Sequence, residues 1–382
     1  MALEPRILPS LTAVAADDWA RLEDHGNPFL SHAFLAGLER TGSIGPHAGW
    51  SPHHLALYEG ERLVAFAPTY AKNNSHGEFV FDWAWADAYQ RNGLAYYPKL
   101  LTGVPYSPVT GPRLLTARDH PDPAALRDAL IELALGQCRE MGFSSWHCNF
   151  VRADDLASLA ARGLLQRHDW QFHWRNRAYG DFDDFLADLR SRKRKNIRRE
   201  RAQLTHAGVT VAWRRGRELD EDDLAFVYAC YIDTFRQYGN YPALRPEFFA
   251  LLARELDTGF RVAFAERDGR RLAMAVFLSG GGRLYGRYWG CVEEVPGLHF
   301  EVAYYQGIEF CIRHGIEVFE SGAQGEHKIG RGFLPSPTRS CHFVAHEGFR
   351  TAIAAHLERE HEWMADYHER LNAMSPFRHD LE

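Results

Sequence analysis

One short segment of the 382-residue chain holds side chains that could move a proton and bind a negative charge. Within Gly325–Gly332 stand Glu326, His327, Lys328 and Arg331, spaced among glycines that let a backbone approach a ligand closely. A carboxylate or an imidazole can act as a general base, and cations can bind an oxyanion. We therefore predict Glu326, His327 and Lys328 as catalytic residues, with Glu326 or His327 as the base, and Arg331 as a substrate-binding residue. A solvated polar loop is the alternative interpretation.

The place of this segment supports a site. It follows the apolar run Ile316–Phe319, which is typical of a buried strand. In open α/β sheets, ligands bind beyond the carboxyl ends of the strands.

A predicted helix over Leu298–Phe310 carries a second group of such side chains on its first two turns. We expect His299, Glu301 and Tyr305 to bind substrate, because Glu301 and Tyr305 are four residues apart and share a helix face. For each tyrosine of this helix, packing in a core is the simpler interpretation.

Positive charge is concentrated between Arg190 and Arg201, where eight basic residues and one acidic residue occur, although the whole chain has a net charge of −6. The surrounding stretch Asp183–Gly208 is a predicted helix, with acidic residues in its first turn and glycine after its end. A solvated face normally alternates in sign, and the apolar stripe is thin for a membrane-surface helix. We favour binding of a phosphate-bearing ligand. The expected ligands of the phosphate are Arg192, Lys193, Arg194 and Lys195.

Asp82 is the last candidate for chemistry. It lies in the aromatic run Phe79–Trp85, which is typical of a strand whose tryptophans pack in a core. Its carboxylate could bind a substrate amine.

The elements that position these residues recur in the two halves of the chain. Each half contains a predicted β-hairpin, a third strand, an amphipathic stretch, a helix ending in glycine and a buried strand. This pattern predicts an α/β fold with a mixed sheet and two tandem domains, residues 1–180 with a proline-rich insertion at 96–123, and residues 181–382 beginning with the basic helix. The repeated segments are Leu55–Tyr70 and Val262–Leu278, Phe79–Trp85 and Arg283–Cys291, the stretches after Gly93 and Gly297, and the strands after Gly142 and Gly315.

Composition limits the class of protein. Hydrophobic residues at 46% and charged residues at 25% are ordinary for a globular chain. The N-terminus lacks a secretory signal pattern and no apolar run could span a membrane. Six dispersed cysteines indicate reduced thiols and a cytoplasmic location.

His342 and His346 would stand about 13 Å apart on a strand, so we predict no metal site.

Several segments together resemble an uncharacterised bacterial family of predicted N-acyltransferases, related to the Fem-type peptidoglycan aminoacyltransferases. The resemblance implies two GNAT-like domains that move an acyl group, acetyl or aminoacyl, to the amine of a small molecule or peptide. The donor would be a CoA thioester such as acetyl-CoA or an aminoacyl-tRNA, which makes tRNA a possible partner. The segments that carry the likeness are Phe81–Tyr89, Tyr96–Leu101, Pro105–Leu115, Leu298–Phe310 and Gly322–Thr338.

The donor stays open. The turn before Leu298 holds Glu293 and Glu294 beside a single Gly297, whereas the pyrophosphate loop of acetyl-CoA-dependent GNAT enzymes is a Gln/Arg-x-x-Gly-x-Gly/Ala turn. The first copy has neither His nor Glu in the corresponding predicted helix, LAYYPKLL, so we expect the chemistry in the second copy. The alternative function is a non-catalytic GNAT-fold module that binds a phosphorylated ligand or a peptidoglycan precursor. The chain carries no decisive signal for oligomerisation.

Overall fold

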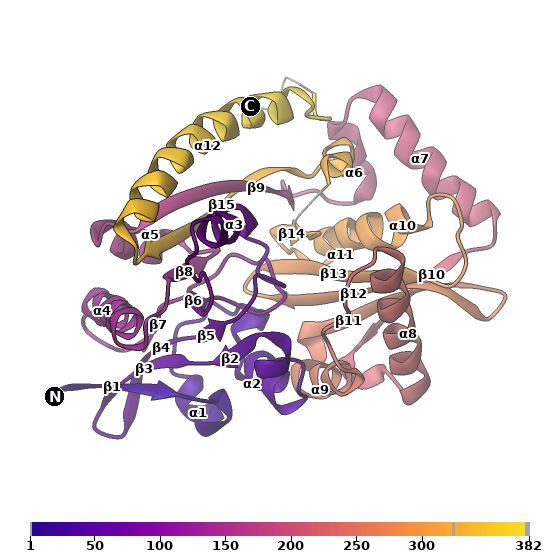
Figure 1. Cartoon of the computed structure of the whole chain (residues 1–382). Coiled ribbons are helices and arrows are strands. Elements are labelled where there is room, and N and C mark those ends of the chain that lie inside the picture. The colour runs from indigo at the N-terminus through magenta and orange to yellow at the C-terminus, as the bar shows by residue number, and fades with distance from the viewer. Residues whose placement is uncertain (1, 323–324, 379–382) are drawn as a thin grey trace. The chain divides into compact units, whose positions relative to one another are not determined.

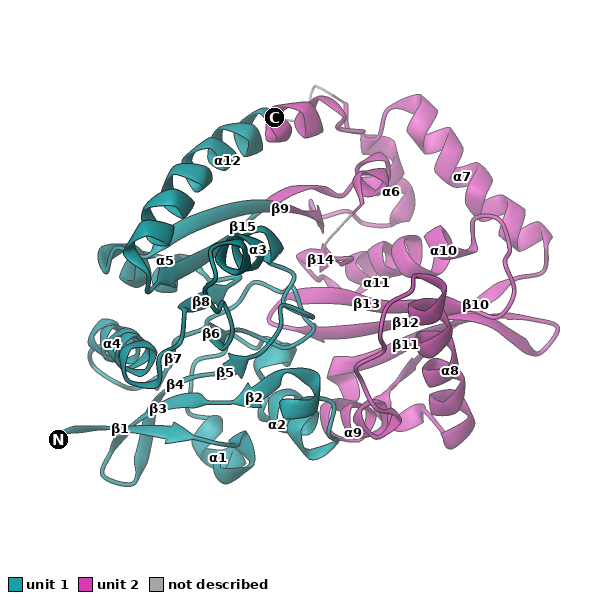
Figure 2. Ribbon diagram, in the orientation of Figure 1, with its two compact units in different colours: residues 1–169, 337–366 teal, residues 170–336, 367–382 magenta. Residues whose placement is uncertain are grey.

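A computed structural model describes residues 2–322 and 325–378. The chain forms two compact units, shown in teal and magenta in Figure 2. The first unit comprises Met1–Asp169 and Pro337–Asp366, and the second comprises Trp170–Ser336 and Tyr367–Glu382. The sequence repeat suggested two continuous ranges with a boundary at residue 180, whereas the chain returns to the first unit after residue 336.

The second unit contains a mixed sheet with the strand order β10-β11-β12-β13-β14-β9. All its neighbouring strands are antiparallel except β13 and β14, which are parallel. The expected hairpin and third strand are confirmed as β11–β12 and β13. The strands are β10 (Thr210–Arg215), β11 (Phe260–Arg267), β12 (Arg270–Gly280), β13 (Arg283–Cys291), β14 (Val318–Glu320) and β9 (Leu165–Arg175).

Helices cover both faces of this sheet (Figure 1). Two helices precede β11, namely α8 (Glu221–Gln237) and α9 (Pro246–Leu256). Because side chains alternate along a strand, Phe264 of β11 packs near Phe226 of α8, whereas its neighbours Ala263 and Ala265 join the core on the other face.

That other face is covered by a helix spanning residues 298–314, which has a defect near its start. It consists of α10 (Leu298–Phe300), a π-helical turn η6 (Glu301–Tyr305) and α11 (Gln306–His314). Gly315 ends it with a φ of +63°, as the sequence predicts. Single π-helical turns inside helices occur frequently at functional sites.

The predicted basic helix over Asp183–Gly208 is broken in two. It forms α6 (Phe182–Asp188) and α7 (Ser191–His206), separated by Leu189 in an extended conformation. The cause is a distant partner, because Leu189 forms a β-bridge with Phe377 and the Arg190 amide donates to the Pro376 carbonyl.

The first unit contains two sheets. One has the order β1-β3-β4-β7, and its β3–β4 pair is the hairpin predicted for the first half. The other includes the order β15-β8-β6-β5-β2, in which β6 and β8 are parallel. The strands are β1 (Leu3–Leu8), β2 (Trp50–Pro52), β3 (His54–Glu59), β4 (Arg62–Ala67), β5 (Thr69–Lys72), β6 (Lys99–Thr102), β7 (Leu115–Thr116), β8 (Ser145–Asn149) and β15 (Leu334–Val344).

Its helices include α4, which connects β6 to β8 and ends at Gly142 in the left-handed conformation, as predicted. None of the helices in the described part of the chain combines the length and the apolar sequence needed to cross a bilayer. The α-helices are α1 (Ala16–Trp19), α2 (His32–Arg40), α3 (Trp83–Arg91), α4 (Pro123–Met141), α5 (Ala153–Ala161) and α12 (Glu347–Ala373), of which α12 continues into the second unit.

Two expectations for the first unit are wrong. Phe79–Trp85 forms no strand; α3 begins at Trp83, and Phe79 adopts a φ of +60°. The stretch LAYYPKLL forms no helix; it is irregular up to β6, because Pro98 cannot continue a helix. The third strand of the first copy is therefore β6, and its helix is α4. With this correction both copies contain a hairpin, a third strand, a helix and a strand parallel to the third. The expected α/β fold with mixed sheets is confirmed, and the arrangement recurs in the two units.

Candidate functional site

A cavity of about 420 Å³ lies between α7 and the 3-10 helix η7 (Glu326–Arg331) in the second unit. We call it the cationic cleft. It brings together three predicted elements, namely the basic helix, the glycine-rich segment and the start of the 298–314 helix. Its lining residues are Lys193, Asn196, Ile197, Tyr305, Glu326, His327, Gly330, Arg331 and Met374.

Glu200 of α7 is the centre of a hydrogen-bond network at this cleft. Its carboxylate accepts hydrogen bonds from Asn196 Nδ2 at 2.9 Å, from Arg331 Nη2 at 3.2 and 3.3 Å, and from the Tyr305 hydroxyl. The Arg331 guanidinium also lies 3.3 Å from the centre of the Phe300 ring. Arg331 Nε is buried and has no hydrogen-bond partner among the described residues.

His327 and Glu326 are both exposed at the cleft. His327 Nε2 is hydrogen-bonded to the Tyr304 hydroxyl at 3.1 Å, and the Tyr367 hydroxyl donates to Glu326 Oε1 at 2.8 Å. Burial, followed by the charges of Lys328 and Arg331, lowers the pKa of His327 below its usual value. The imidazole is therefore neutral near pH 7 and able to accept a proton.

Gly325 fixes the place of this imidazole. Its φ is +121°, and a Cβ at this position would lie 2.5 Å from His327 Cε1. We expect Gly325→Ala to displace His327 and to lower the unfolding free energy by about 1–3 kcal/mol. Gly136→Ala is the control, because Gly136 lies within α4 and a Cβ there meets nothing within 4 Å. Chemical denaturation of both variants checks the difference, and equal stability of the two would contradict this account of Gly325.

Lys328 points away from the cleft and toward the end of β14. Its Nζ donates to the carbonyl oxygens of Ser321 and Gly322, each at 2.9 Å. The side chain is 3% exposed and forms no ion pair with any described residue. Burial, with a smaller contribution from the charge of Arg287, lowers the pKa of Lys328 to about 7.

Lys328 lies where two parallel strands part. β13 pairs with β14 only over Arg283–Tyr285 and Val318–Glu320, and residues 286–291 of β13 pair with β12. Ser321 and Gly322 directly follow the last pair. The ammonium therefore stands at the apex of the split between the strands, as a hydrogen-bond donor with little competition from water.

His299 belongs to an aromatic cluster beside this apex. Its ring centre is 5.1 Å from that of Trp289 and 5.2 Å from that of Tyr304. Burial, then the charges of His327, Arg331 and Lys328, lower the pKa of His299 to about 4. These shifts indicate that three of the predicted site residues, His327, Lys328 and Arg331, lie within electrostatic reach of His299.

Of the four predicted phosphate ligands on α7, Arg192, Lys193 and Lys195 are exposed and line one cavity, whereas Arg194 is half-buried and does not line it. Arg192, Lys193, Arg194 and Lys195 form no ion pair with any described residue. A shallow cavity of about 680 Å³ adjoins the cationic cleft, with which it shares Lys193 and Asn196. Its lining residues are Arg192, Lys193, Lys195, Asn196 and Arg199.

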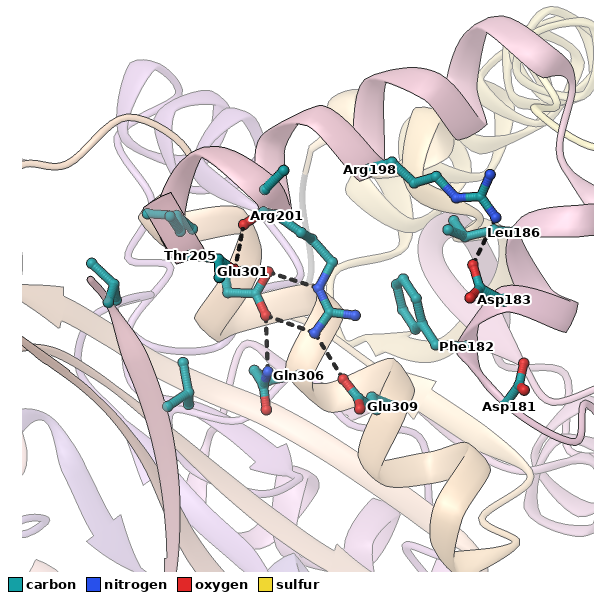
Figure 3. A pocket seen from close by; sticks show the side chains of 14 residues that line it. Asp181, Phe182, Asp183, Leu186, Arg198, Arg201, Thr205, Glu301, Gln306 and Glu309 are labelled. Carbon is teal, nitrogen blue, oxygen red and sulfur yellow. Dashed lines mark hydrogen bonds and ion pairs between the residues drawn. The ribbon is translucent and has the colours of Figure 1, made fainter. Parts of the chain in front are cut away.

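The opposite face of α7 lines a separate pocket of about 590 Å³, shown in Figure 3. Arg201 donates to Glu301 at 3.0 and 3.1 Å and to Glu309 at 2.8 Å, and it lies over the ring of Phe182. Gln306 Nε2 also donates to Glu301, at 2.8 Å. Glu301 is thus engaged in attaching the basic helix to the 298–314 helix, whereas Tyr305 reaches the cationic cleft.

Asp82 belongs to the first unit, where it is 2% exposed. It accepts hydrogen bonds from Lys99 Nζ and, at 2.6 Å, from the Tyr96 hydroxyl. Lys99 also donates to Glu78 at 2.8 Å and to Ser75 Oγ at 3.0 Å. The structure therefore does not bring Asp82 to a surface that a substrate amine could reach.

Sequence reasoning missed two residues of the site. Glu200 is the only acid within Arg190–Arg201, and a single acid in a basic run is a feature by which the sequence could have identified it. Tyr304 was expected in the core; it is 4% exposed, but its hydroxyl reaches His327. Among the described residues, no group of three or more His, Cys, Asp or Glu side chains could hold a metal ion.

A family model named FemAB-like, described as peptidoglycan biosynthesis/recognition, matches residues 10–379 of the chain. No curated protein matches the chain.

Solved structures similar to the chain show the same fold. FemX is 12% identical with a TM-score of 0.53, and the match covers 92% of this chain and 100% of FemX. The C-terminal domain of an Agrobacterium fabrum protein named as a lysylphosphatidylglycerol synthetase gives the same identity and TM-score, over 90% of this chain and 94% of that one. A protein of unknown function from Bacteroides thetaiotaomicron is 11% identical with a TM-score of 0.51, over 88% and 99% of the two chains.

Proposed function

Because the chain belongs to the FemAB-like family, we propose that it is an N-acyltransferase. It would move an acetyl or aminoacyl group from a CoA thioester or an aminoacyl-tRNA to the amine of a small molecule or peptide. The observation that carries the proposal is the split between β13 and β14, with Lys328 Nζ at its apex beside the cationic cleft.

The geometry supports direct transfer. The acceptor nitrogen attacks the acyl carbonyl carbon, and His327, neutral at pH 7, takes the proton that the nitrogen loses. The Lys328 ammonium stabilises the oxyanion of the tetrahedral intermediate. The intermediate then expels the thiolate of CoA or the ribose oxygen of tRNA, and either leaving group can receive the proton from His327.

The position of α7 bears on how the donor binds. Gly297, which precedes the 298–314 helix, packs against α7, and a Cβ there would lie 3.7 Å from the carbonyl oxygen of Glu200. Glu293 of the preceding turn binds Arg267. Since α7 and an acidic turn occupy the start of the helix, we infer that the donor phosphates bind in the cationic cleft and along Arg192–Lys195 instead. This favours an aminoacyl-tRNA donor over CoA.

The decisive experiment follows labelled acyl groups from acetyl-CoA and, separately, from mixed aminoacyl-tRNA into a panel of amines and lysine-containing peptides. Thermal-shift titration with CoA thioesters gives an independent test of the first donor. Transfer from either donor would establish the function. Binding without transfer from both would favour the alternative, a non-catalytic module. The proposal includes a cytoplasmic location, because both donors are cytoplasmic; the described cysteines are all free thiols.

Reversing the charge of the free lysines of α7 should weaken donor binding. We expect the double variant Lys193→Glu/Lys195→Glu to bind tRNA at least tenfold more weakly than the wild type and with a smaller dependence of affinity on salt. The matched control is Arg217→Glu/Arg254→Glu, which reverses two cations of the second unit that are both over 70% exposed. Fluorescence anisotropy over a series of salt concentrations measures both. An equal loss in the control would indicate a general charge effect and no specific site.

A further inference from the structure

Glu200 stands out because it is a carboxylate that binds Arg331 and Tyr305, two residues that line the cationic cleft. It is the one acid within the basic run, yet its side chain is 15% exposed and the Arg331 side chain 12%. Glu200 shares the cleft face of α7 with Lys193, Asn196 and Ile197, which line the cavity at helical spacing.

The donors around Glu200 are those that a phosphate group would use. Arg331 offers a planar guanidinium, Tyr305 a hydroxyl and Asn196 an amide, all directed at one carboxylate. They come from three elements, α7, η6 and η7, so a purely local hydrogen bond does not explain the arrangement. Guanidinium and hydroxyl donors suit the oxygen atoms of a phosphate as well as those of a carboxylate.

The cleft beside them has room for a ligand. Its volume is about 420 Å³, and its lining includes Lys193, Arg331, the exposed His327 and one exposed acid, Glu326. A phosphate entering this cleft would meet Lys193 and Arg331, but it would be repelled by the Glu200 carboxylate unless that side chain moved away.

We propose that Glu200 is an internal placeholder for a ligand phosphate. In the free protein its carboxylate holds Arg331 and Tyr305 in position; on binding, a phosphate replaces it on Arg331. This inference deepens the proposed function and rests on the phosphate-binding role of the cleft. Glu200 is then a positioning residue that sets the affinity for the ligand and prevents weaker anions from occupying the site.

The test compares binding of inorganic pyrophosphate to the full-length wild type and to Glu200→Gln by isothermal titration calorimetry at fixed ionic strength. The glutamine keeps the shape and the acceptor oxygen but removes the competing charge. We expect Glu200→Gln to bind pyrophosphate about tenfold more tightly than the wild type. Glu132→Gln is the matched control, since it removes one exposed acid of the first unit, paired with Arg162, and should leave the affinity unchanged.

A merely structural Glu200 would give the opposite result, because loss of its ion pair would loosen Arg331 and weaken binding. Unchanged or weaker binding by Glu200→Gln therefore overturns the placeholder. The Lys193→Met variant separates this failure from that of the proposed function. If the wild type binds pyrophosphate and Lys193→Met binds it more weakly, the cationic cleft is a phosphate-binding site even where the placeholder role of Glu200 is refuted. If neither the wild type nor Glu200→Gln binds pyrophosphate, the phosphate-binding role of the cationic cleft and the placeholder role of Glu200 are both refuted.

Discussion

The Lys328→Met variant is expected to lose acyl transfer by about 10²- to 10³-fold while remaining as stable as the wild type, or more stable, at pH 7. The activity falls because the variant removes the donor at the split of β13 and β14. Stability is kept because Lys328 is buried without an ion-pair partner among the described residues, so its removal also removes a desolvation penalty. Labelled acyl transfer and chemical denaturation measure the two effects.

Arg91→Met is the control for this variant, because it removes an exposed cation of the first unit that is paired with Asp87. It should change neither activity nor stability. His327→Asn separates the two proposed roles, since it should remove the base and leave the oxyanion donor in place. A Lys328→Met protein that keeps wild-type activity would refute the assignment, and one that unfolds would show that the lysine is structural.

The pH dependence follows from the lowered pKa. In the folded protein the pKa of Lys328 is about 7, whereas that of an unfolded lysine is about 10.4. Between these values the unfolded chain binds more protons, so Lys328 makes stability rise with pH across this range. Lys328→Met should lack this contribution, and the difference in unfolding free energy between variant and wild type should shrink from pH 7 to pH 10. Activity should fall above pH 7, because the ammonium is the active form.

The local pattern of the chain predicted much of the fold. The alternating runs around Glu59-Gly60-Glu61 and Asp268-Gly269 are hairpins, and Gly142 and Gly315 end their helices in the left-handed conformation. These features depend on neighbours within a few residues, where periodicity and turn chemistry decide the outcome.

The errors arose where distant residues decide. The basic helix breaks at Leu189 because that residue pairs with Phe377. The aromatic run at Phe79–Trp85 resembles a strand, but Glu78 and Asp82 turn inward to Lys99. Likewise, the sequence placed Lys328 beside Glu326 and His327, and only the fold shows that it points toward β14. Contacts between residues that are far apart along the chain leave no periodic signal.

The second large effect concerns the stability of the first unit. We expect Lys99→Met to lower the unfolding free energy by about 3–5 kcal/mol. Lys99 is completely buried and donates to Glu78, Asp82 and Ser75. Burial alone would lower its pKa, but the charges of Glu78 and Asp82 raise it, so the lysine is charged in the folded protein. Methionine would leave two buried carboxylates with one remaining cation, Lys72, whose pKa burial lowers to about 7.

Three further variants distinguish loss of charge pairing from loss of packing. Lys195→Met makes the same substitution at an exposed lysine without an ion pair and should change stability by less than about 0.5 kcal/mol. In Lys99→Met/Asp82→Asn the carboxylate left unpaired becomes a neutral amide, so part of the lost stability should return. Denaturant unfolding of the wild type, Lys99→Met, the single variant Asp82→Asn and the double variant gives the coupling between the two sites. If the double variant is as unstable as the sum of the single ones, packing around Lys99 matters and its charge does not. If the double variant regains part of the lost stability, the role of Asp82 is to form a buried ion pair with Lys99 and not to bind a substrate amine.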